Sequence, residues 1–232
     1  MSRPAGSRDV VRRLAVGELG WDDLVVEPAV SELLRGLADR AALGGLTVAI
    51  HGPAGVGKTF AVRVWAEAMR LDLWAVDCPA LVERHGPGTS TRGLQEALAY
   101  GERPHAVLLF HDAAALPVAA LTALLGRAAA RRAPTVLETR APLQGPRLAE
   151  VARVELPFPD ASLRRRHWER LVARASPLSR PELDTLARVE APGAVIDAAV
   201  RQVVLAAGDE RLETDALVAA AHRALAETPA RP

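Results

Sequence analysis

The residues with the clearest chemical pattern are eight consecutive ones, Gly52-Pro53-Ala54-Gly55-Val56-Gly57-Lys58-Thr59. They match the motif G-x-x-x-x-G-K-[ST], in which glycines let backbone N–H groups curl around phosphate groups. In such a loop the lysine reaches the β- and γ-phosphates, and the hydroxyl residue, here Thr59, binds Mg²⁺. Lys58 is the single lysine of the chain, which makes its position in the motif informative. The motif therefore predicts a site for ATP or ADP with Mg²⁺.

The segments on either side of the motif have the patterns of a strand and a helix. Residues 46–50 are apolar and partly β-branched, as in a buried parallel strand. Residues 60–70 carry apolar side chains at helical spacing, and Phe60 at their start joins the predicted nucleotide contacts. A glycine-rich turn with a chance lysine is the alternative. A strand before the motif and a helix after it are the context that a phosphate loop requires, and they favour the loop.

A second motif is expected on another strand, because phosphate-loop proteins hold Mg²⁺ with an acid that follows an apolar run. Residues 106–110 form such a run, and His111 and Asp112 follow it. We predict catalytic roles for His111 and Asp112, and a metal-binding role for Asp112 together with Thr59. For His111, a role as a metal ligand or a proton-linked switch and that of an ordinary strand-end residue both stay open.

The order of the predicted elements indicates the fold class. Apolar segments that read as buried strands cover residues 46–50, 71–77, 106–112, 134–139 and 153–158. Helical patterns separate them, which favours an α/β fold with a parallel sheet in three layers, the phosphate-loop NTPase architecture. The pattern after residue 159 is helical only, with predicted helices over residues 163–175, 181–189, 193–207 and 214–227.

These patterns divide the chain into three parts. Residues 1–20 carry arginine, glycine and serine and are predicted to be frayed. Residues 21–160 are predicted to form the α/β nucleotide-binding domain. Residues 161–232 are predicted to form a small helical lid subdomain, with Ser162 capping its first helix.

Composition excludes several classes of protein. The net charge of +1 does not suit a polycation that binds nucleic acid or anionic lipid. No apolar stretch reaches the roughly 18–20 residues of a membrane span, and the first residues lack the apolar region of a secretory signal. Cys78 stands alone, which excludes a disulfide framework or a cysteine-built zinc site. We expect a cytoplasmic protein with neither a membrane nor a nucleic acid as partner.

An α/β nucleotide domain followed by a small helical subdomain resembles the AAA+ ATPases. Residues 21–26, WDDLVV, look like the N-terminal linker of that family, whose backbone lies against adenine. Residues 191–197, APGAVID, look like its second sensor region. The resemblance covers residues 21–225, is nearest to the Cdc48-like branch with its stand-alone bacterial members, and implies nucleotide contacts at Leu24, Val25 and Gly193.

The second motif departs from the AAA+ pattern of four apolar residues followed by Asp-Glu. In that frame His111 replaces the metal-side aspartate and Asp112 replaces the catalytic glutamate. A frame shifted by one residue keeps Asp112 at the metal and puts Ala113 at the base. Either frame loses one acid. A neutral imidazole is a poor ligand for Mg²⁺, and an aspartate in place of the glutamate holds its carboxylate further from the attacking water.

Further departures concern the groups that assist hydrolysis. Arg140 stands where the family has the asparagine of its first sensor, and Leu148 and Ala149 stand where it has arginine fingers. Arg147 comes one residue too early. The pore loop, residues 84–88, has no aromatic residue. Loss of a finger alone can lower turnover by ~10³–10⁵.

Two functions fit these observations. The favoured one is an ATP-binding AAA+ family protein with weak or no ATP hydrolysis, which acts as a nucleotide-dependent module in a protein assembly. The alternative is an active AAA+ ATPase that remodels a protein partner. The implied partner is a protein, either further copies of this chain or a related active AAA+ subunit. Phosphate release and oligomer formation under ATP distinguish the two functions.

Overall fold

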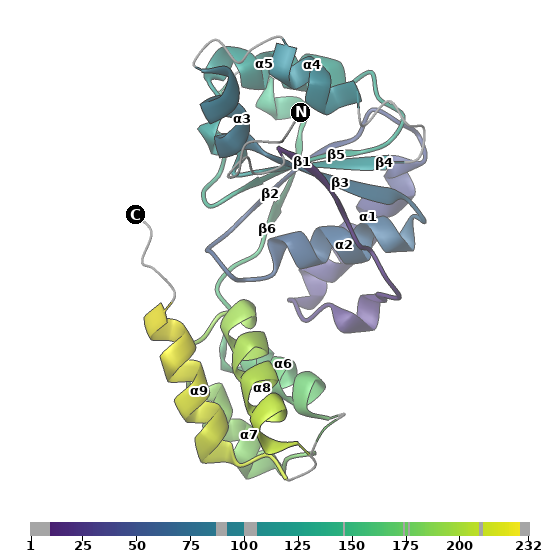
Figure 1. The fold of residues 1–232 in the computed structure, drawn as a ribbon. Helices are drawn as coiled ribbons and strands as arrows, with labels where there is room; N and C mark the ends of the chain where they lie inside the picture. Colours follow the sequence, from purple (N-terminus) through teal and green to yellow (C-terminus); the bar gives the residue numbers. More distant parts are fainter. Residues whose placement is uncertain are drawn as a thin grey trace. The chain divides into compact units, whose positions relative to one another are not determined.

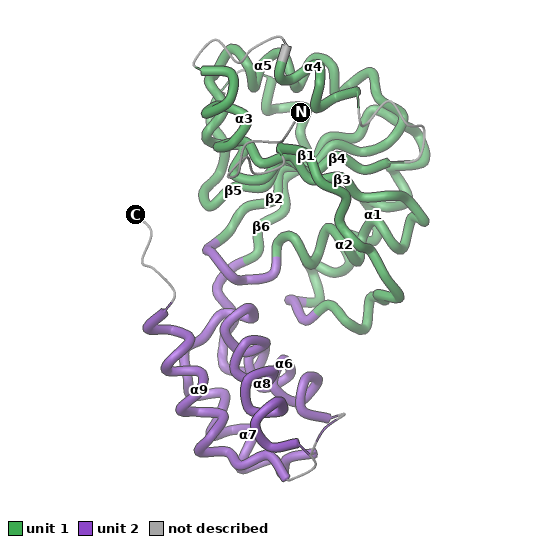
Figure 2. The backbone as a smooth tube through the Cα atoms, viewed as in Figure 1, with its two compact units in different colours: residues 1–24, 28–52, 58–156 green, residues 25–27, 53–57, 157–232 purple. Residues whose placement is uncertain are grey.

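The computed structural model describes residues 10–86, 92–99, 106–145, 147–173, 175, 177–208 and 211–227. The chain divides into two compact units, which Figure 2 shows in different colours. Unit 1 contains the residues up to Leu24, residues 28–52 and residues 58–156. Unit 2 contains Val25–Glu27, Pro53–Gly57 and the residues from Pro157 onward. The boundary after Leu156 therefore separates the sheet-forming part of the chain from its helical C-terminal part.

Unit 1 is built around a six-stranded sheet with the order β1-β3-β4-β5-β2-β6. The strands are β1 (Val11–Leu14), β2 (Thr47–His51), β3 (Asp72–Asp77), β4 (Ala106–His111), β5 (Thr135–Thr139) and β6 (Ala152–Glu155). Strands β2 to β6 are the five predicted ones, and they pair in parallel. The predicted fold class, α/β with a parallel sheet, is confirmed.

Strand β1 lies in the segment that was predicted to be frayed. It pairs antiparallel with β3, from Val11 opposite Val76 to Leu14 opposite Leu73. The prediction of fraying is wrong for this stretch, because backbone pairing with β3 and an ion pair between Arg13 and Asp72 at 2.6 Å hold it. These are long-range interactions that a four-residue segment with two arginines does not announce in its own pattern. Residues 1–9 lie outside the described residues.

Helices cover both faces of the sheet, as Figure 1 shows. On one face lie α1 (Pro28–Ala41) and α2 (Lys58–Ala68), and on the other lie α3 (Cys78–His85), α4 (Arg92–Ala99) and α5 (Val118–Ala128). Leu108, Phe110 and Leu137 of the sheet belong to the core cluster that includes residues of α3, α4 and α5. On the opposite face Trp65 of α2 is buried and donates to the backbone oxygen of Leu34 in α1 at 2.9 Å. The sheet is thus the middle of three layers.

Unit 2 consists mainly of helices, with its own core. These are α6 (Ala161–Val172), α7 (Arg180–Ala187), α8 (Gly193–Ala207) and α9 (Thr214–Glu227), and their core includes Trp168, Ile196 and Leu217. The four predicted helices are present. The predicted cap is wrong, since Asp160 and not Ser162 accepts the hydrogen bond from the backbone N–H of Leu163, at 2.7 Å. Ser162 lies inside the first turn, where a side chain cannot serve as the N-cap.

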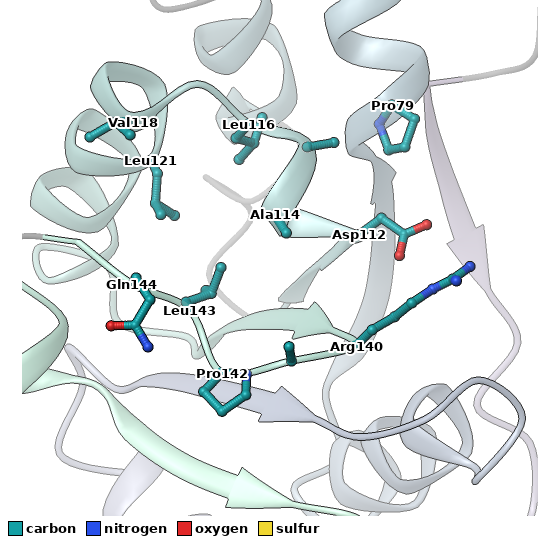
Figure 3. A pocket seen from close by; sticks show the side chains of 12 residues that line it. Pro79, Asp112, Ala114, Leu116, Val118, Leu121, Arg140, Pro142, Leu143 and Gln144 are labelled. Carbon is teal, nitrogen blue, oxygen red and sulfur yellow. The ribbon is translucent and has the colours of Figure 1, made fainter. Parts of the chain in front are cut away.

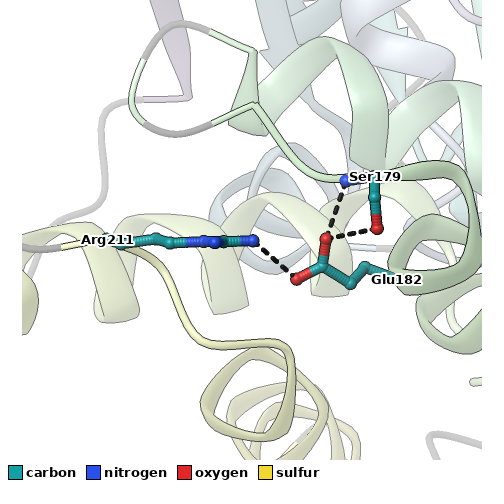
Figure 4. A network of polar contacts seen from close by, with 3 residues as sticks. All are labelled: Ser179, Glu182 and Arg211. Atoms are coloured by element: carbon teal, nitrogen blue, oxygen red, sulfur yellow. Dashed lines mark hydrogen bonds and ion pairs between the residues drawn. The ribbon is translucent and has the colours of Figure 1, made fainter.

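A polar network fixes the start of α7, as Figure 4 shows. The backbone N–H and the hydroxyl of Ser179 both donate to Oε2 of Glu182, at 2.7 and 2.5 Å. Arg211, which precedes α9, donates to Oε1 of Glu182 at 3.0 Å. The hydrogen bonds from Ser179, followed by Arg211, lower the pKa of Glu182. This is a capping box, reinforced by one ion pair.

None of the helices in the described part of the chain is long and apolar enough to cross a membrane.

Candidate nucleotide-binding site

Several predicted site residues gather where the parallel strands of unit 1 end. Strands β2, β4 and β5 end at His51, His111 and Thr139, and β5 lies between the other two in the sheet. Because the strands are parallel, their carboxyl ends meet at one edge, which is where ligands bind in open α/β sheets. The topology therefore brings the residue before the phosphate loop, the second motif and the first-sensor segment to the same edge.

Gly52 opens the loop in a conformation and a space that only glycine fits. Its φ is 150°, and a Cβ at this position would lie 2.0 Å from the backbone oxygen of Leu156. The N–H of Leu156 donates to the backbone oxygen of His51 at 2.8 Å. The chain entering the loop and the chain leaving β6 therefore approach too closely for a side chain at position 52.

The loop residues Pro53–Gly57 belong to unit 2. Gly55 and Gly57 have φ values of 78° and 98°, in the left-handed region. A Cβ at Gly57 would meet no atom within 4 Å, whereas one at Gly55 would lie 3.2 Å from Pro192. The N–H of Ala194 donates to the backbone oxygen of Gly55 at 2.9 Å. The space beside the backbone at Gly57 is therefore open.

The resemblance to AAA+ proteins adds three predicted contact residues, which the structure places as follows. Leu24 is buried in unit 1, directly after the short helix η1 (Trp21–Asp23). Val25 and Gly193 belong to unit 2. Gly193 begins α8, and a Cβ on it would lie 3.3 Å from the ring of His167. Their contacts with a nucleotide stay predictions.

Lys58 is the first residue of α2 and is only 7% exposed. Its Nζ donates to the backbone oxygen of Gly52 at 2.9 Å. Burial lowers the pKa of Lys58, while the carboxylates of Glu138 and Asp112 act in the opposite direction. The lysine is therefore held at the beginning of its own loop, close to two negative charges.

A carboxylate that the sequence patterns do not single out, Glu138 of β5, connects the phosphate loop with the second motif. The hydroxyl of Thr59 donates to Oε2 of Glu138 at 2.9 Å. Nδ1 of His111 lies 2.9 Å from the same oxygen. Burial acts to raise the pKa of Glu138, but hydrogen bonds and charge from His111, then Thr59 and Lys58, bring it below its usual value. Glu138 is therefore ionised at neutral pH.

The alternation of side chains along the strands explains this arrangement. Phe110 and Leu137 are paired in the parallel register, and both belong to the core cluster beneath α3, α4 and α5. The next residue on each strand, His111 and Glu138, points to the opposite face, where α2 begins with Lys58 and Thr59. A signal for Glu138 was present in the sequence, because a glutamate within an apolar strand buried on both faces needs a partner.

The imidazole of His111 acts as a hydrogen-bond donor to Glu138. Its Nε2 is buried and has no hydrogen-bond partner among the described residues. The N–H at Nδ1 supplies the bond to Glu138, whose Oε2 lies 2.9 Å away. Nδ1 is therefore occupied by Glu138.

Asp112 follows His111 at the same edge of the sheet, where its charge acts on Lys58, and it also lines a pocket. Its φ is 48°, in the left-handed region, and it precedes the short helix η2 (Ala113–Ala115). Figure 3 shows Asp112 and Arg140 at the same end of a pocket of about 610 Å³. The apolar walls of the pocket include Leu116, Val118, Leu121 and Leu143. His111 is thus connected to Thr59 through Glu138, while Asp112 lines the pocket, and the choice between the two frames of the second motif stays a prediction.

The two positions at which the AAA+ pattern has arginine fingers, Leu148 and Ala149, carry uncharged side chains. Leu148 is 4% exposed and belongs to the core cluster, and Ala149 is exposed. Arg147 is exposed with φ 66°, and its guanidinium lies beside Gly126. In the predicted pore loop, residues 84–86 end helix α3, whereas residues 87 and 88 lie outside the described residues.

No group of three or more histidine, cysteine, aspartate or glutamate side chains within the described ranges is arranged to hold a metal ion.

Comparison with known proteins bears on the fold of part of the chain. Residues 48–132 match the sequence model of the AAA family, "ATPase family associated with various cellular activities". The match covers less than half of the chain, and together with the parallel sheet it supports an α/β fold like that of the AAA family. A glycogen synthase from Rhodospirillum rubrum is 35% identical over 86 residues, which are 36% of this chain. The aligned part is 17% of that curated relative, so the chain spans only a small fraction of its length.

Proposed function

We propose that this chain binds ATP or ADP together with Mg²⁺ and hydrolyses ATP weakly or not at all. The observation that carries the proposal is the loop from Gly52 to Thr59, with left-handed glycines, open space at Gly57 and a buried lysine at the start of α2. Backbone N–H groups, a helix N-terminus and an ammonium group are the donors that phosphate groups need. Thr59 would hold Mg²⁺, which neutralises charge on the phosphate oxygens when it is bound.

Weak hydrolysis follows from the groups around this loop. The place of the catalytic glutamate is taken by Asp112, whose shorter side chain faces the pocket beside Arg140. The place of the arginine finger is taken by Leu148, which is buried in the core. A general base contributes about 10²–10⁴ to a rate, and a finger about 10³–10⁵. Loss of both predicts turnover far below that of an ordinary ATPase.

A protein that binds ATP without consuming it acts through the conformation that the nucleotide stabilises. We infer a nucleotide-dependent module in a protein assembly, whose partner is either further copies of this chain or a related active AAA+ subunit. The alternative remains an active AAA+ ATPase that remodels a protein. Because the likeness to the glycogen synthase covers 17% of that protein, its named activity does not enter the proposal.

The test is calorimetric titration of ATP and ADP with Mg²⁺ into the wild-type protein and two variants. Lys58→Ala removes a hydrogen bond to a charged group, worth about 1.5–3 kcal/mol, so affinity should fall by about 10- to 150-fold. Arg63→Ala is the matched control, because Arg63 lies on the same helix but donates to the backbone oxygen of Ala15. It should bind like the wild type.

Two outcomes contradict the proposal. Absence of saturable binding of either nucleotide to the folded wild-type protein overturns nucleotide binding. Steady-state phosphate release near ~1 s⁻¹ or above, an ordinary rate for an enzyme, overturns weak hydrolysis and supports the active ATPase instead.

A further inference from the structure

We propose that Glu138 supplies the metal-side carboxylate of the nucleotide site, the place that the AAA+ pattern gives to an aspartate on the neighbouring strand β4. In this arrangement His111, which occupies the aspartate's position, is a positioning residue that acts through Glu138. The inference rests on the proposed binding of a nucleotide with Mg²⁺. It names which carboxylate of this chain faces the metal, a role that the sequence pattern assigns to Asp112.

The first argument is the contact with Thr59. In a phosphate loop the hydroxyl of this residue is the side-chain ligand of Mg²⁺, and the acid of the second motif holds the ion through water close by. Here the carboxylate next to that hydroxyl is Glu138, at 2.9 Å. Asp112, on its left-handed residue after β4, instead lines the pocket with Arg140.

The second argument is the geometry of the carboxylate. The side chain of Glu138 is 14% exposed, and His111 and Thr59 both approach its Oε2 at 2.9 Å. An ionised carboxylate has about four lone-pair sites, so these two bonds leave it able to accept from further donors or to face a cation. Carboxylate oxygen and a hydroxyl are the hard ligands that Mg²⁺ prefers.

The third argument concerns why position 111 carries a histidine and not an aspartate. With Glu138 in the corner, an aspartate at position 111 would place a second negative charge beside it, and two buried like charges at this separation repel strongly. An imidazole in that place offers an N–H donor instead, and Nδ1 of His111 lies 2.9 Å from Glu138. The exchange of aspartate for histidine on β4 is therefore matched by the glutamate on β5.

The chain offers a matched control at the next pair of strands. Nε2 of His51, at the end of β2, lies 3.9 Å from Oε2 of Glu155, at the end of β6. The Glu155 side chain is 70% exposed. The pair has the same residue types at the same edge of the sheet, but it lacks the contact with the loop hydroxyl. It should have no part in metal binding.

The experiment measures ADP affinity by calorimetry in EDTA and in excess Mg²⁺, and takes the ratio as the magnesium effect. We expect the wild type and Glu155→Gln to show the same effect, and Glu138→Gln to lose 10–100-fold of it, the usual cost of disturbing the surroundings of a metal. Affinity in EDTA should not fall in Glu138→Gln. Titration of the ADP complexes with Mn²⁺, followed by electron paramagnetic resonance, should show the same order of metal affinity.

Two further variants test the pairing of the two residues. His111→Ala should lower the magnesium effect, while His111→Gln, whose amide N–H can still donate to Glu138, should keep most of it. Adding His111→Asp to Glu138→Gln returns an acid to β4 and should restore the effect. Circular dichroism and thermal melts identify any variant that does not fold.

The outcomes separate this inference from the function on which it rests. No ADP or ATP binding in either EDTA or Mg²⁺ overturns the proposed function, and this inference with it. Binding in EDTA with an unchanged magnesium effect in Glu138→Gln, or with no magnesium effect in the wild type, overturns only the assignment of Glu138.

Discussion

Two glutamates, one in each unit, take part in nearly the same set of interactions. Glu182 accepts from the N–H and hydroxyl of Ser179 and from Arg211, as Figure 4 shows. Glu138 accepts from the hydroxyl of Thr59 and pairs with His111. The interactions lower the pKa of both carboxylates. The partners of Glu182 are exposed to solvent, whereas those of Glu138 are partly buried.

The difference in solvent exposure changes how much these interactions contribute to the free energy of unfolding. An exposed ion pair exchanges its partners for water at little cost, so most exposed pairs contribute about 0–1 kcal/mol in measurements on proteins generally. A buried carboxylate cannot make that exchange, and removal of one partner leaves others unsatisfied. The pair in unit 2 therefore caps a helix, while the corner in unit 1 fixes three residues of the predicted nucleotide site in one geometry.

The largest effect that we expect concerns turnover at the buried corner. The triple variant His111→Asp, Asp112→Glu, Glu138→Gln places both acids of the AAA+ second motif on β4 without a third carboxylate beside them. It should raise steady-state phosphate release by about 10²-fold over the wild type, the lower end of what a general base contributes. Activity should remain incomplete, because Leu148 is still buried at the finger position.

The same variant with Lys58→Ala is its control and should show no phosphate release above background. His111→Asp with Asp112→Glu, and Glu138 retained, should gain less than the triple variant because two carboxylates then repel each other. Equal rates for these two variants would contradict the interaction between positions 111 and 138.

A smaller effect is expected on stability. Replacement of Glu138 should lower the free energy of unfolding more than replacement of Glu182. Glu138→Ala leaves the hydroxyl of Thr59 and the N–H of His111 without their acceptor. Each unsatisfied buried group costs about 1–3 kcal/mol, so the free energy of unfolding should fall by an amount in that range or above. Glu182→Ala should lower it less, because water replaces the lost acceptor. Urea unfolding of the two variants measures both changes, and the opposite order would show that burial does not decide between them.

The same contrast explains which features were predictable from the sequence. Helices α8 and α9 were predicted with the bounds that the structure shows, because their apolar spacing is local. Local patterns alone missed strand β1. They also placed the N-cap of α6 at Ser162, whereas Asp160 accepts the capping hydrogen bond. The phosphate loop is readable because its residues are consecutive.

The corner at Glu138 was not predictable in the same way, because its partners come from other parts of the chain. Thr59 is 79 residues away from Glu138, and only the pairing of β5 with β2 and β4 brings these segments to one edge. A motif search compares positions within one segment, so it marks the loss of an acid at His111 and not the gain of one on the adjacent strand. The register of the sheet is the missing information.

The smallest expected effect is a change with pH in the difference in unfolding free energy between the wild type and Glu138→Gln. The pKa of Glu138 in the folded protein is below its ordinary value of 4.5, because His111 and Thr59 favour the ionised form. A carboxylate with a lowered pKa stabilises the folded state above its unfolded pKa, and this contribution is lost as the pH falls through the folded pKa. The stability gap between the wild type and Glu138→Gln should therefore be constant above about pH 5 and narrow below pH 4.5.

At neutral pH, salt should change the stability contributions of Glu182 and Glu138 to different extents. The gap between the wild type and Glu182→Gln should shrink when salt rises from 0.1 to 1 M, since the Debye length falls from about 10 Å to about 3 Å and the Arg211 side chain is exposed. The gap for Glu138→Gln should persist, because buried charges are screened much less. Urea unfolding of the wild type and both variants, at both salt concentrations and from pH 3 to 7, measures how each gap depends on salt and on pH. If salt moves the two gaps together at neutral pH, the corner at Glu138 is as open to water as the cap of α7, and it cannot hold a carboxylate in place for a metal.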